Sequence, residues 1–522
     1  MYSDSAPPPS PVKSGSGIAR AVAGAALAAA TARTSRAAPG SDAELTSLTL
    51  AEASARIKAG SVTSVQLTEA CLARIGVYGP KLDSVITVMT EKALAQARAL
   101  DAELKSGKSR GPLHGIPIML KDNIDTAGTR TTAASAVFED RVPAEDATVV
   151  TRLKAAGAVI IAKANLHEFA MGIGDASYWG PPRNPWALER NTGGSSSGSG
   201  ASVSAELCYG ALGTDTGGSI RIPSSFCGIV GLKGTYGLVP IRGIVPLTVS
   251  LDHCGPMTRT VEDAALMYDV LAGYDRLDIT SVEHPKESYS AALAQPVSGI
   301  RLGIPSFFYD ELDHEVDAAV KEATRVLAGL TGQGPTEALM PPFLQYGGLG
   351  GGAETYAYHR EYYEKTPTRY TLPVRRRLEA MSKIEGNGAA YVRSKWSLDL
   401  LRRTVDDAFT NFDVLITPTT RVLPPLLVDL LRAQRDPVGG GAGGISEVVA
   451  NTSPYDVYGL PAISVPCGFS KSGLPIGLTI AGPRFSEGKI LALARAYEQA
   501  TEWHKRRPAL SPSMPVPSVS PA

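Results

Sequence analysis

The chain predicts an α/β fold, built as a single large domain with a mixed, mostly parallel β-sheet covered by helices on both faces. Two observations predict this fold. Short apolar runs such as "GIPIML", "AVIIAKAN", "DVLITP" and "AISVPCGF" are separated by segments with helical signals. The 522 residues, 43% of them hydrophobic, are also enough to bury one large core.

Helical signals dominate the segments that precede and separate these strands. "TLAEASARIKAG" ends at Gly60, and Thr63 with Gln66 forms a capping box before a second helix. "EKALAQARALDAELKSG" predicts a third helix, and "DATVVTRLKAAG" predicts a fourth just before "AVIIAKAN". In the less regular stretch 291–444, "QYGGLGGGAETYAY" and "DPVGGGAGG" are expected to be mobile loops.

The two ends of the chain differ in composition from the predicted domain at 45–507. Residues 1–44 are expected to form a disordered or targeting extension, because Pro, Ser and Gly dominate its start and its alanine-rich apolar run is short. The tail 508–522 is rich in Pro and Ser and is expected to be disordered. No run of 18 apolar residues occurs elsewhere in the chain, so we expect no membrane span. We expect a cytoplasmic location, with export or organelle targeting by the extension left open.

Charge and cysteine content exclude several classes of function. Lys and Arg together equal Asp and Glu together, at 51 each, which argues against nucleic acid or an anionic membrane surface as partner. The five scattered cysteines indicate reduced thiols, and no C-x-x-C or H-E-x-x-H spacing indicates a metal site. We expect no cofactor, and as partners a small-molecule substrate and water, with a homodimer left open.

The segment "NTGGSSSGSGASVSA" resembles a flexible linker in composition. It also matches the nucleophile-elbow pattern G-x-S-x-G with Ser196 at the centre, which requires a strand immediately before it. The preceding residues contain three prolines and do not predict a strand. The lack of a lysine after it argues against a phosphate-binding loop.

Three separated segments, read together, explain this stretch better. They are "LHGIPIMLKDNIDTAGT", "NTGGSSSGSGAS" and "GALGTDTGGSIRIPSSFCGIVGLKGTYG", and in this order they resemble the amidase signature family of serine hydrolases. The resemblance covers roughly 45–508, with a further segment in "NTSPYDVYGLPAISVPCGF". It implies the amidase signature fold, with a signature core at about 111–290, a variable substrate-pocket region at about 291–450 and a C-terminal core segment at 451–507.

The resemblance implies a role for each motif. Ser219 is similar to the nucleophile that forms the acyl-enzyme, Ser195 to the bridging serine that follows a cis peptide bond, and Lys121 to the base. The backbone near Ala170 is expected to line the scissile bond. The expected oxyanion hole consists of the backbone N–H groups of Thr216, Gly217, Gly218 and Ser219.

Elementary chemistry supports these roles. A lysine acts as a base only when neutral, and burial after an apolar run such as the one before Lys121 lowers its pKa. The Ser195 hydroxyl can donate and accept at once, so it can relay a proton from Ser219 to Lys121. Asp215 and Arg221 flank Ser219 and are expected to pair and hold the nucleophile loop.

The expected function is hydrolysis of the amide C–N bond of a small substrate. Aromatic residues in the variable region favour an apolar or aryl substrate. One alternative is a glutamyl-tRNA amidotransferase A-type subunit that releases ammonia from glutamine; His253 and Ile222, where that group usually has glutamine, argue against it. A carbamate or ester hydrolase with the same triad is also left open, as is a non-enzymatic binding protein on this scaffold.

Overall fold

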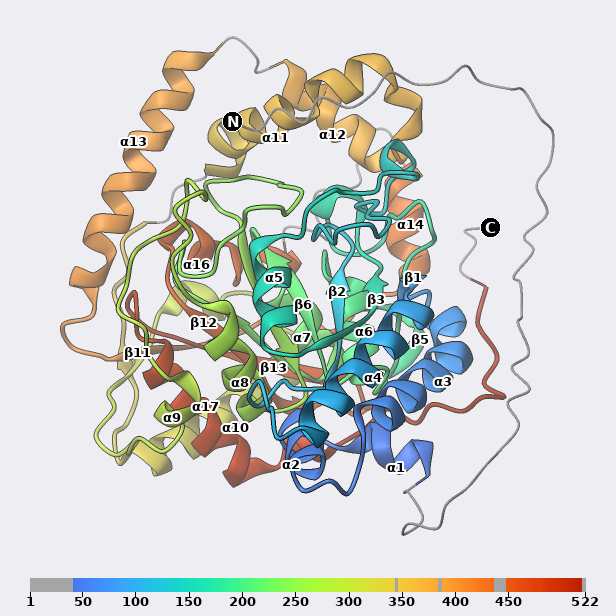
Figure 1. The fold of residues 1–522 in the computed structure, drawn as a ribbon. Coiled ribbons are helices and arrows are strands. Elements are labelled where there is room, and N and C mark those ends of the chain that lie inside the picture. Colours follow the sequence, from blue (N-terminus) through green and yellow to red (C-terminus); the bar gives the residue numbers. More distant parts are fainter. Residues whose placement is uncertain (1–40, 343–345, 384–386, 436–446, 519–522) are drawn as a thin grey trace. The chain divides into compact units, whose positions relative to one another are not determined.

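An eleven-stranded sheet runs through the domain. The computed structural model describes residues 41–342, 346–383, 387–435 and 447–518. The strand order is β1-β3-β2-β6-β8-β7-β12-β13-β11-β9-β10. Figure 1 labels β1, β2, β3, β6, β11, β12 and β13 of this sheet. The strands are β1 Val85–Val88, β2 Pro117–Lys121, β3 Val159–Ala164, β6 Gly210–Asp215, β7 Val230–Lys233, β8 His253–Thr258, β9 Leu302–Ile304, β10 Thr336–Glu337, β11 Val414–Pro418, β12 Ala462–Phe469 and β13 Pro475–Ala481.

Parallel pairing holds in two groups of strands, β3-β2-β6 and β11-β9-β10. The other neighbouring strands pair antiparallel, including β12 with β13, which a short turn joins directly. The first parallel group carries the site described below: β2 ends at Lys121 and β6 ends at Asp215, so these ends lie at one edge of the sheet.

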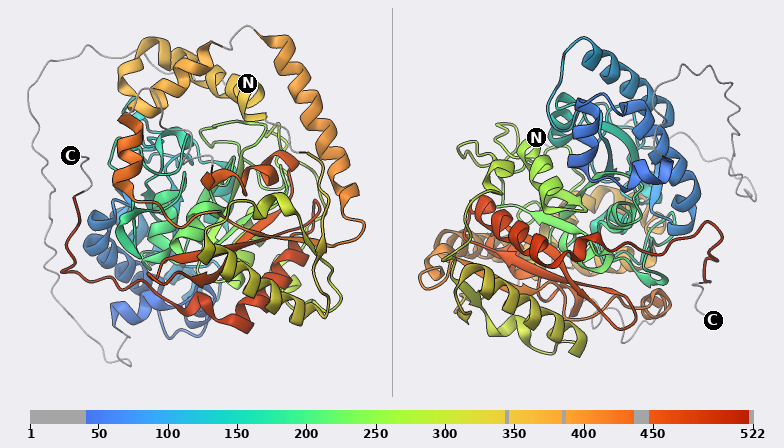
Figure 2. Two further views of the ribbon diagram at one scale, coloured as in Figure 1. Left: turned by 180° about the vertical axis from the view of Figure 1, so that it is seen from behind. Right: turned by 90° about the horizontal axis from the view of Figure 1, so that it is seen from below.

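Helices pack on both faces of the sheet, as Figure 2 shows from two further directions. Two glycines of β6 face different helices on the two sides of the sheet. A side chain at Gly210 would meet Met267 of α8, and one at Gly213 would meet Ser196 and Ile220, next to α6 and α7. The expected α/β domain with a mixed sheet covered on both faces is therefore confirmed. The helices are α1 Asp42–Ser47, α2 Leu50–Lys58, α3 Ser64–Leu82, α4 Thr90–Lys105, α5 Thr148–Ala155, α6 Ser197–Ser204, α7 Arg221–Cys227, α8 Val261–Leu271, α9 Tyr289–Ala292, α10 His314–Thr331, α11 Tyr346–Lys365, α12 Leu372–Ser382, α13 Gly388–Thr404, α14 Leu427–Arg435, α16 Ser453–Tyr458 and α17 Glu487–Thr501.

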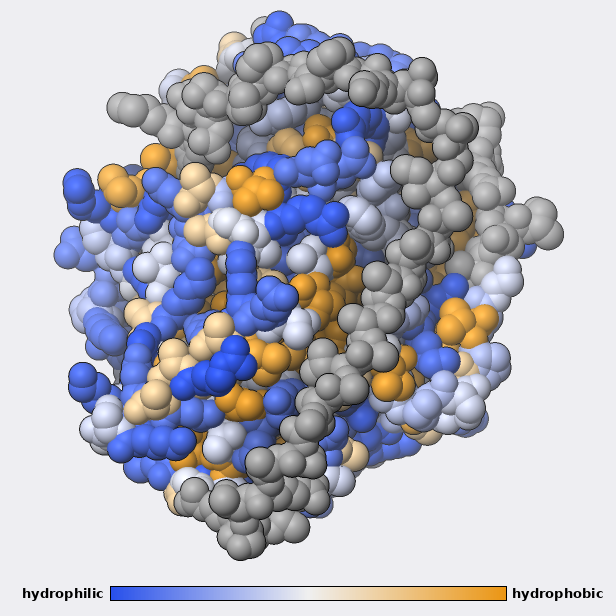
Figure 3. All heavy atoms as spheres, turned by 45° about the vertical axis from the view of Figure 1, so that its right-hand side comes forward, coloured by the Kyte–Doolittle hydropathy of each residue, from blue (hydrophilic) through white to orange (hydrophobic). Residues whose placement is uncertain are grey.

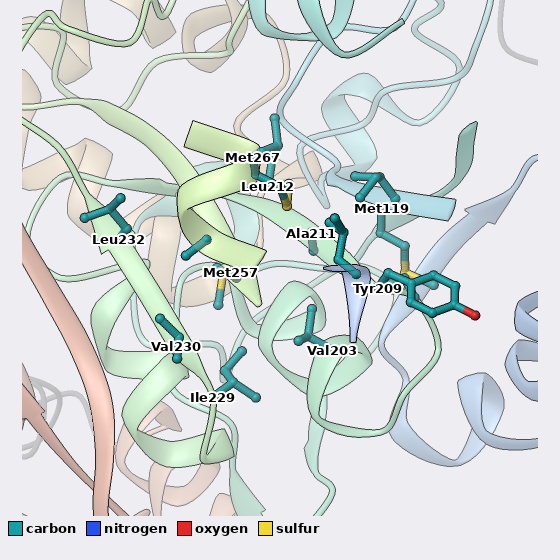
Figure 4. Packing of buried hydrophobic residues seen from close by; sticks show 14 of the residues in the cluster. Met119, Val203, Tyr209, Ala211, Leu212, Ile229, Val230, Leu232, Met257 and Met267 are labelled. Carbon is teal, nitrogen blue, oxygen red and sulfur yellow. The ribbon is translucent and has the colours of Figure 1, made fainter. Parts of the chain in front are cut away.

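The largest core cluster lies between the central strands and these helices. Figure 4 shows Met119 of β2, Leu212 of β6, Leu232 of β7, Met257 of β8 and Met267 of α8 pointing into it. All five side chains are fully buried. Strands whose two faces are both covered must be apolar along their whole length, which is why "GIPIML" and its equivalents read as continuous apolar runs.

The expected helix signals are present in the structure. Helix α2 ends at Lys58, and Gly60 follows with φ of 68°. Thr63 and Gln66 form the capping box of α3, with Thr63 Oγ1 accepting from Gln66 N. α1 begins at Asp42, three residues before the predicted start of the domain.

The glycine-rich passage "QYGGLGGGAETYAY" was expected to be a loop, and this prediction is wrong, because α11 begins at Tyr346 and continues through it. Tertiary contacts outweigh the low helix propensity of glycine here. Thr355 Oγ1 donates to Leu247 O at 2.7 Å, and Glu354 accepts from Ser250 N at 2.8 Å. The second passage, "DPVGGGAGG", lies outside the described residues.

Two further expectations differ from the structure. Residues 508–518 form no helix or strand, yet Leu510 and Met514 pack against the core, and Lys81 Nζ donates to Met514 O at 2.8 Å. A two-stranded ribbon of β4 (Arg183–Asn184) and β5 (Ala187–Asn191) precedes the Gly/Ser stretch, where the prolines predicted no strand. The prolines lie before and between these short strands, so they leave the ribbon intact.

The face shown in Figure 3 carries its hydrophobic residues as scattered patches among hydrophilic ones. Within the described ranges, none of the helices has the length and apolar character that a bilayer crossing requires. The expected extension 1–44 lies almost wholly outside these ranges.

Truncation of a central core side chain tests this packing. Leu232→Ala is expected to lower the free energy of unfolding by about 2–5 kcal/mol, since it leaves a cavity in a fully buried strand. The exposed control Leu339→Ala, at a residue that is 79% exposed, is expected to change it by less than about 0.5 kcal/mol. Urea titration followed by circular dichroism measures both, and equal midpoints for the two variants would contradict the placement of the core.

Candidate active site

Lys121 ends the buried strand β2, and its side chain is fully buried. Its Nζ lies 2.7 Å from Ser195 Oγ and 2.7 Å from Thr214 Oγ1, with Thr214 O at 3.4 Å. Thr214 belongs to β6, the parallel neighbour of β2. Two adjacent strand ends therefore hold the amine beside one serine hydroxyl.

Burial lowers the pKa of Lys121 to about 7, although the carboxylates of Asp215 and Asp252 raise it in part. Within the described residues, no carboxylate lies within ion-pair distance of its Nζ. The buried Lys163 differs in this respect, because its Nζ lies 3.5 Å from Asp122 Oδ1. A buried amine without a counter-ion can be neutral near pH 7, which is the state that a general base needs.

Ser195 follows a cis peptide bond between Gly194 and Ser195. A side chain on Gly194 would lie 2.4 Å from Gly174 N, so only glycine fits there. The Ser195 carbonyl accepts from His167 N at 3.1 Å and from Ser197 Oγ at 3.2 Å, and Ser195 is fully buried. This stretch is therefore a packed turn into α6, and it is not a linker.

Ser196, the centre of the nucleophile-elbow match, has a structural role. Its Oγ donates to Thr214 O at 3.1 Å and accepts from Thr214 N at 3.2 Å. These bonds connect the Gly/Ser turn to Thr214 of β6, whose Oγ1 also contacts Lys121 Nζ.

Ser219 lies in the turn between β6 and α7 and is 9% exposed. Its carbonyl accepts from Ser196 N at 3.3 Å, which joins the nucleophile turn to the Ser195 turn. The described residues include no hydrogen bond between the Ser195 and Ser219 hydroxyls. Lys121 and Ser195 are thus in direct contact, whereas Ser219 is connected to the same turn through the bond of its carbonyl to Ser196 N.

The Asp215 carboxylate holds this turn. It accepts from Gly218 N at 2.5 Å and from Ile220 N at 3.1 Å, and Arg221 Nε lies 3.0 Å from its Oδ2. Burial would raise the pKa of Asp215, but the Arg221 guanidinium outweighs it and holds the pKa well below its usual range. Arg221 in turn bonds Asp456 Oδ2 at 2.7 Å and Thr452 O at 2.9 Å.

This geometry changes one expectation for the oxyanion hole. The Gly218 N–H is occupied by Asp215, because the positive φ of 128° at Gly218 turns the backbone back toward that carboxylate. The N–H groups of Thr216, Gly217 and Ser219 make no hydrogen bond with any described residue. They are the members of the expected set that can donate to a substrate oxygen.

Ala170 ends a short turn, Glu168–Ala170, in which Phe169 and Ala170 have positive φ. Ala170 lines a small cavity together with Asn123, Thr214 and Thr216. The turn is anchored to the start of α12, because Glu168 Oε2 accepts from Thr371 N at 2.8 Å. Ala170 therefore lies on the wall of a cavity that Thr214 and Thr216 also line, and its expected role beside the scissile bond stays a prediction.

Thr214 and Asp456 are candidate site residues that sequence reasoning missed. Thr214 directly precedes Asp215 in β6, but successive side chains of a strand point to opposite faces, so this position does not indicate a contact with Lys121. Asp456 lies in the segment "NTSPYDVYG" of the family resemblance, but nothing local connected it with Arg221, which it contacts from the distant helix α16.

His253 lies behind this loop, where its Nε2 is 3.3 Å from Lys233 Nζ and its Nδ1 is 2.7 Å from Leu251 O. Burial and the neighbouring Lys233 lower its pKa well below the usual value, so the ring is neutral. Ile222 is buried in a small apolar cluster with Ile173, Phe226 and Val448.

Comparison with known proteins identifies the family. The Amidase family model matches residues 66–491. The A subunit of the glutamyl-tRNA(Gln) amidotransferase of Moorella thermoacetica is 40% identical over 492 residues, which cover 90% of this chain and 99% of the relative. The corresponding protein of Carboxydothermus hydrogenoformans is 39% identical over 90% of this chain and 100% of the relative.

Solved structures agree with this assignment. The structure of 6-aminohexanoate cyclic dimer hydrolase superposes with a TM-score of 0.80 at 29% identity, covering 89% of this chain and 99% of that one. The peptide amidase of Stenotrophomonas maltophilia superposes with a TM-score of 0.74 at 31% identity, covering 88% of this chain and 98% of that one. The buried Lys121–Ser195 pair thus lies in a fold shared with amidases, and the chain belongs to the amidase family.

Proposed function

We propose that the chain cleaves a carboxamide C–N bond through an acyl-enzyme on Ser219. The observation that carries the proposal is the buried Lys121 amine, which lies 2.7 Å from Ser195 Oγ without a carboxylate partner in the described residues. A serine hydrolase needs a base that is neutral at working pH, and this amine meets that requirement without a histidine.

The proposed proton transfer involves three side chains. Ser219 Oγ attacks the amide carbon while its proton passes to Ser195 Oγ, and the Ser195 proton passes to Lys121 Nζ. The N–H groups of the nucleophile loop stabilise the developing oxyanion; removal of one such donor costs about 3–4 kcal/mol. The proton then returns to the departing amine as the C–N bond breaks, and water repeats the attack to release the acid and restore Ser219.

Thr214 is proposed to orient the base. A neutral lysine amine has two N–H donors and one lone pair, and Thr214 offers two acceptors, Oγ1 at 2.7 Å and O at 3.4 Å. With both donors directed to Thr214, the lone pair is left for the Ser195 hydroxyl. Asn123 Nδ2 donates to the same Thr214 Oγ1 at 3.2 Å and fixes that hydroxyl in turn.

Substitution at Thr214 tests this orientation. Thr214→Val keeps the volume but removes Oγ1, and we expect kcat to fall by about tenfold or more, as for loss of one hydrogen bond to a functional group. Thr214→Ser keeps the hydroxyl and is expected to stay near wild type. Steady-state amide hydrolysis measures both, and wild-type activity in Thr214→Val would exclude the role.

The pH dependence follows from Lys121. Its pKa of about 7 in the folded protein means that the amine gains a proton, and loses its function as a base, as pH falls below 7. We therefore expect kcat/KM to rise about tenfold per pH unit below 7 and to level off above it. A profile that peaks below pH 5, or that rises unchanged to pH 10, would contradict a neutral Lys121.

Glutamine is the amide donor that the comparisons favour, ahead of the small amide that the sequence favoured. Relatives named as A subunits of glutamyl-tRNA(Gln) amidotransferases are 37–40% identical over about nine-tenths of this chain. By that likeness, the chain would release ammonia from glutamine within an assembly of several subunits. Ile222 packs in a small apolar cluster, but His253 lines the same cavity as Ala170, so the histidine in place of the usual glutamine remains an argument against this donor.

A small apolar or aryl amide remains a second candidate because apolar side chains line the cavity that contains Ala170, namely Ile241, Ile244, Val245 and Leu247. Phe169 packs edge-on against Phe138, with ring centroids 5.2 Å apart, and against His359 at 4.4 Å. Val245 belongs to the same apolar cluster and lines the cavity with Ala170. Of the variable-region aromatics, Tyr358, Tyr362 and Tyr363 pack against this cluster, whereas Phe308 packs in a separate core cluster.

A donor panel separates the two candidates. Purified protein is incubated with L-glutamine, an aryl amide, an aliphatic amide, a carbamate and an ester, each with and without the other subunits of a bacterial glutamyl-tRNA(Gln) amidotransferase. Intact mass spectrometry detects the acyl group on Ser219, and an ammonia assay detects turnover. Ser219→Ala should abolish both signals, whereas Ser225→Ala, also buried and outside the turn, controls for folding.

We expect the glutamyl adduct and ammonia from glutamine when the other subunits are present. Turnover of the aryl amide by the chain alone, with no ammonia from glutamine, would favour the small apolar or aryl amide as the substrate. Acylation that persists in Ser219→Ala would contradict the mechanism for every donor.

A further inference from the structure

Gly217 carries one of the three N–H groups that are left to donate to a substrate oxygen. This N–H belongs to the peptide group between Thr216 and Gly217, which makes no hydrogen bond with a described residue through either its N–H or its carbonyl. The peptide group before Thr216 continues from β6, whose last residue, Asp215, pairs with His253 of β8. The direction of the Gly217 N–H therefore depends on what fixes the residues on either side of it.

On the C-terminal side, two hydrogen bonds fix the next peptide group along the turn. Gly218 N donates to Asp215 Oδ1 at 2.5 Å, and Thr452 Oγ1 donates to Gly217 O at 2.7 Å. Both bonds hold the peptide group between Gly217 and Gly218. Because Gly217 has no side chain, rotation about its backbone can still change the direction of its own N–H. A further constraint on that N–H must come from Thr216.

The Asp252 carboxylate provides a constraint on Thr216. Thr216 Oγ1 donates to Asp252 Oδ1 at 2.6 Å. Asp252 directly precedes His253, the first residue of β8, just as Thr216 directly follows Asp215, the last residue of β6. Since Asp215 and His253 are paired, Thr216 and Asp252 lie one position beyond the last pair of two antiparallel strands, where their side chains meet.

Asp252 is itself fixed by the loop that precedes it. Its Oδ2 accepts from Leu247 N at 2.9 Å and from Thr248 N at 3.1 Å. Asp252 is buried and lines the cavity that Ala170 and Thr216 also line. Burial raises the pKa of Asp252 to about 7, although the hydrogen bonds that it accepts lower it in part. Above pH 7 the acceptor for the Thr216 hydroxyl is therefore an ionised carboxylate.

Two helices of the variable region hold this loop from outside. Ser250 N donates to Glu354 Oε2 of α11 at 2.8 Å, and Arg402 Nη2 of α13 donates to Ser250 O at 2.8 Å. The place of Asp252, and through it that of Thr216, is thus set by elements that carry none of the three residues of the expected triad.

We propose that Asp252 is a positioning residue, which holds the Thr216 hydroxyl so that the Gly217 N–H points to the place where the substrate oxyanion forms. The inference rests on the proposed acyl-enzyme mechanism and applies to any donor that acylates Ser219. Without the bond to Asp252, the backbone at Thr216 is free to turn, and the Gly217 N–H is directed at the oxyanion for only part of the time. Misdirection of one donor costs less than its removal, which lowers kcat by about 100-fold to 1,000-fold.

Acylation of Ser219 by 4-nitrophenyl acetate tests the proposal. This activated ester needs no second subunit, and nitrophenolate release together with the intact mass reports the acyl-enzyme, with Ser219→Ala as the background. Phenylboronic acid, which adds to a serine hydroxyl as a tetrahedral anion, probes the same oxyanion donors without turnover. All assays are run on the full-length protein at pH 8.5, where Lys121 and Asp252, each with a pKa of about 7, have lost their protons.

The variants separate the hydroxyl from the rest of the side chain. Thr216→Val removes the hydroxyl at nearly constant volume, and Thr216→Ser keeps it. Thr258→Val is the matched control, because Thr258 is buried at the opposite end of β8 and also loses one hydrogen bond to a carbonyl. Asp252→Asn changes the acceptor, and Asp263→Asn, at another buried aspartate that accepts from a backbone N–H, controls for it.

We expect Thr216→Val to lower the acylation rate constant and to raise the Ki of phenylboronic acid, each by about tenfold and without a change in KM. Thr216→Ser and the two controls should stay near wild type. Asp252→Asn should resemble Thr216→Val, and the double variant should be no slower than Asp252→Asn alone, because both substitutions break one bond.

Wild-type rates in Thr216→Val, additive losses in the double variant, or an unchanged Ki would each overturn the inference while the proposed function stands. A wild-type chain that is not acylated at Ser219 would instead contradict the proposed function, and the inference with it.

Discussion

The contact between the buried Lys121 amine and the Ser195 hydroxyl is the interaction on which the rest of the site depends. An ammonium ion in a dry interior is costly, and the usual solution is a carboxylate partner, as Asp122 provides for Lys163. Lys121 has only hydroxyl and carbonyl groups as hydrogen-bond partners among the described residues, and burial lowers its pKa to about 7; burial also lowers the pKa of Lys163, in spite of Asp122. The sheet produces this environment by ending two parallel strands, β2 and β6, side by side.

A low pKa alone does not select the base. Burial lowers the pKa of Lys233 to about 7 as well. Its Nζ is held by Leu460 O at 2.6 Å and Gly234 O at 3.2 Å, and no described hydroxyl is in reach. The chemistry of the partner separates the two lysines: Lys121 faces a serine that can pass on a proton, whereas Lys233 fills a structural role beside His253.

The nucleophile turn depends on a second buried network. Asp215 binds two backbone N–H groups of the turn and pairs with Arg221, which Asp456 holds from α16. The turn is therefore shaped by side chains that touch no substrate. The same network occupies the Gly218 N–H, which leaves the N–H groups of Thr216, Gly217 and Ser219 as the proposed oxyanion donors.

Much of this arrangement could be predicted from the sequence because its signals are local. The capping box of Thr63 and Gln66 and the apolar strand before Lys121 depend on residues a few positions apart. Asp456 could not be predicted, because its contact with Arg221 joins segments that only the folded sheet brings together. The helix through "GGLGGG" was missed for a similar reason, since distant residues such as Ser250 and Leu247 stabilise it.

Direct titration of the Lys121 amine tests whether the base is neutral at working pH. Protein labelled with [6-¹³C]lysine is followed by NMR from pH 5 to 11, and the Lys121→Met variant assigns the signal. We predict one assigned resonance that titrates near pH 7, far below the usual lysine value of about 10.4. A Lys121 signal that titrates above pH 10 would show a charged amine at neutral pH, and it would contradict the role of Lys121 as the base.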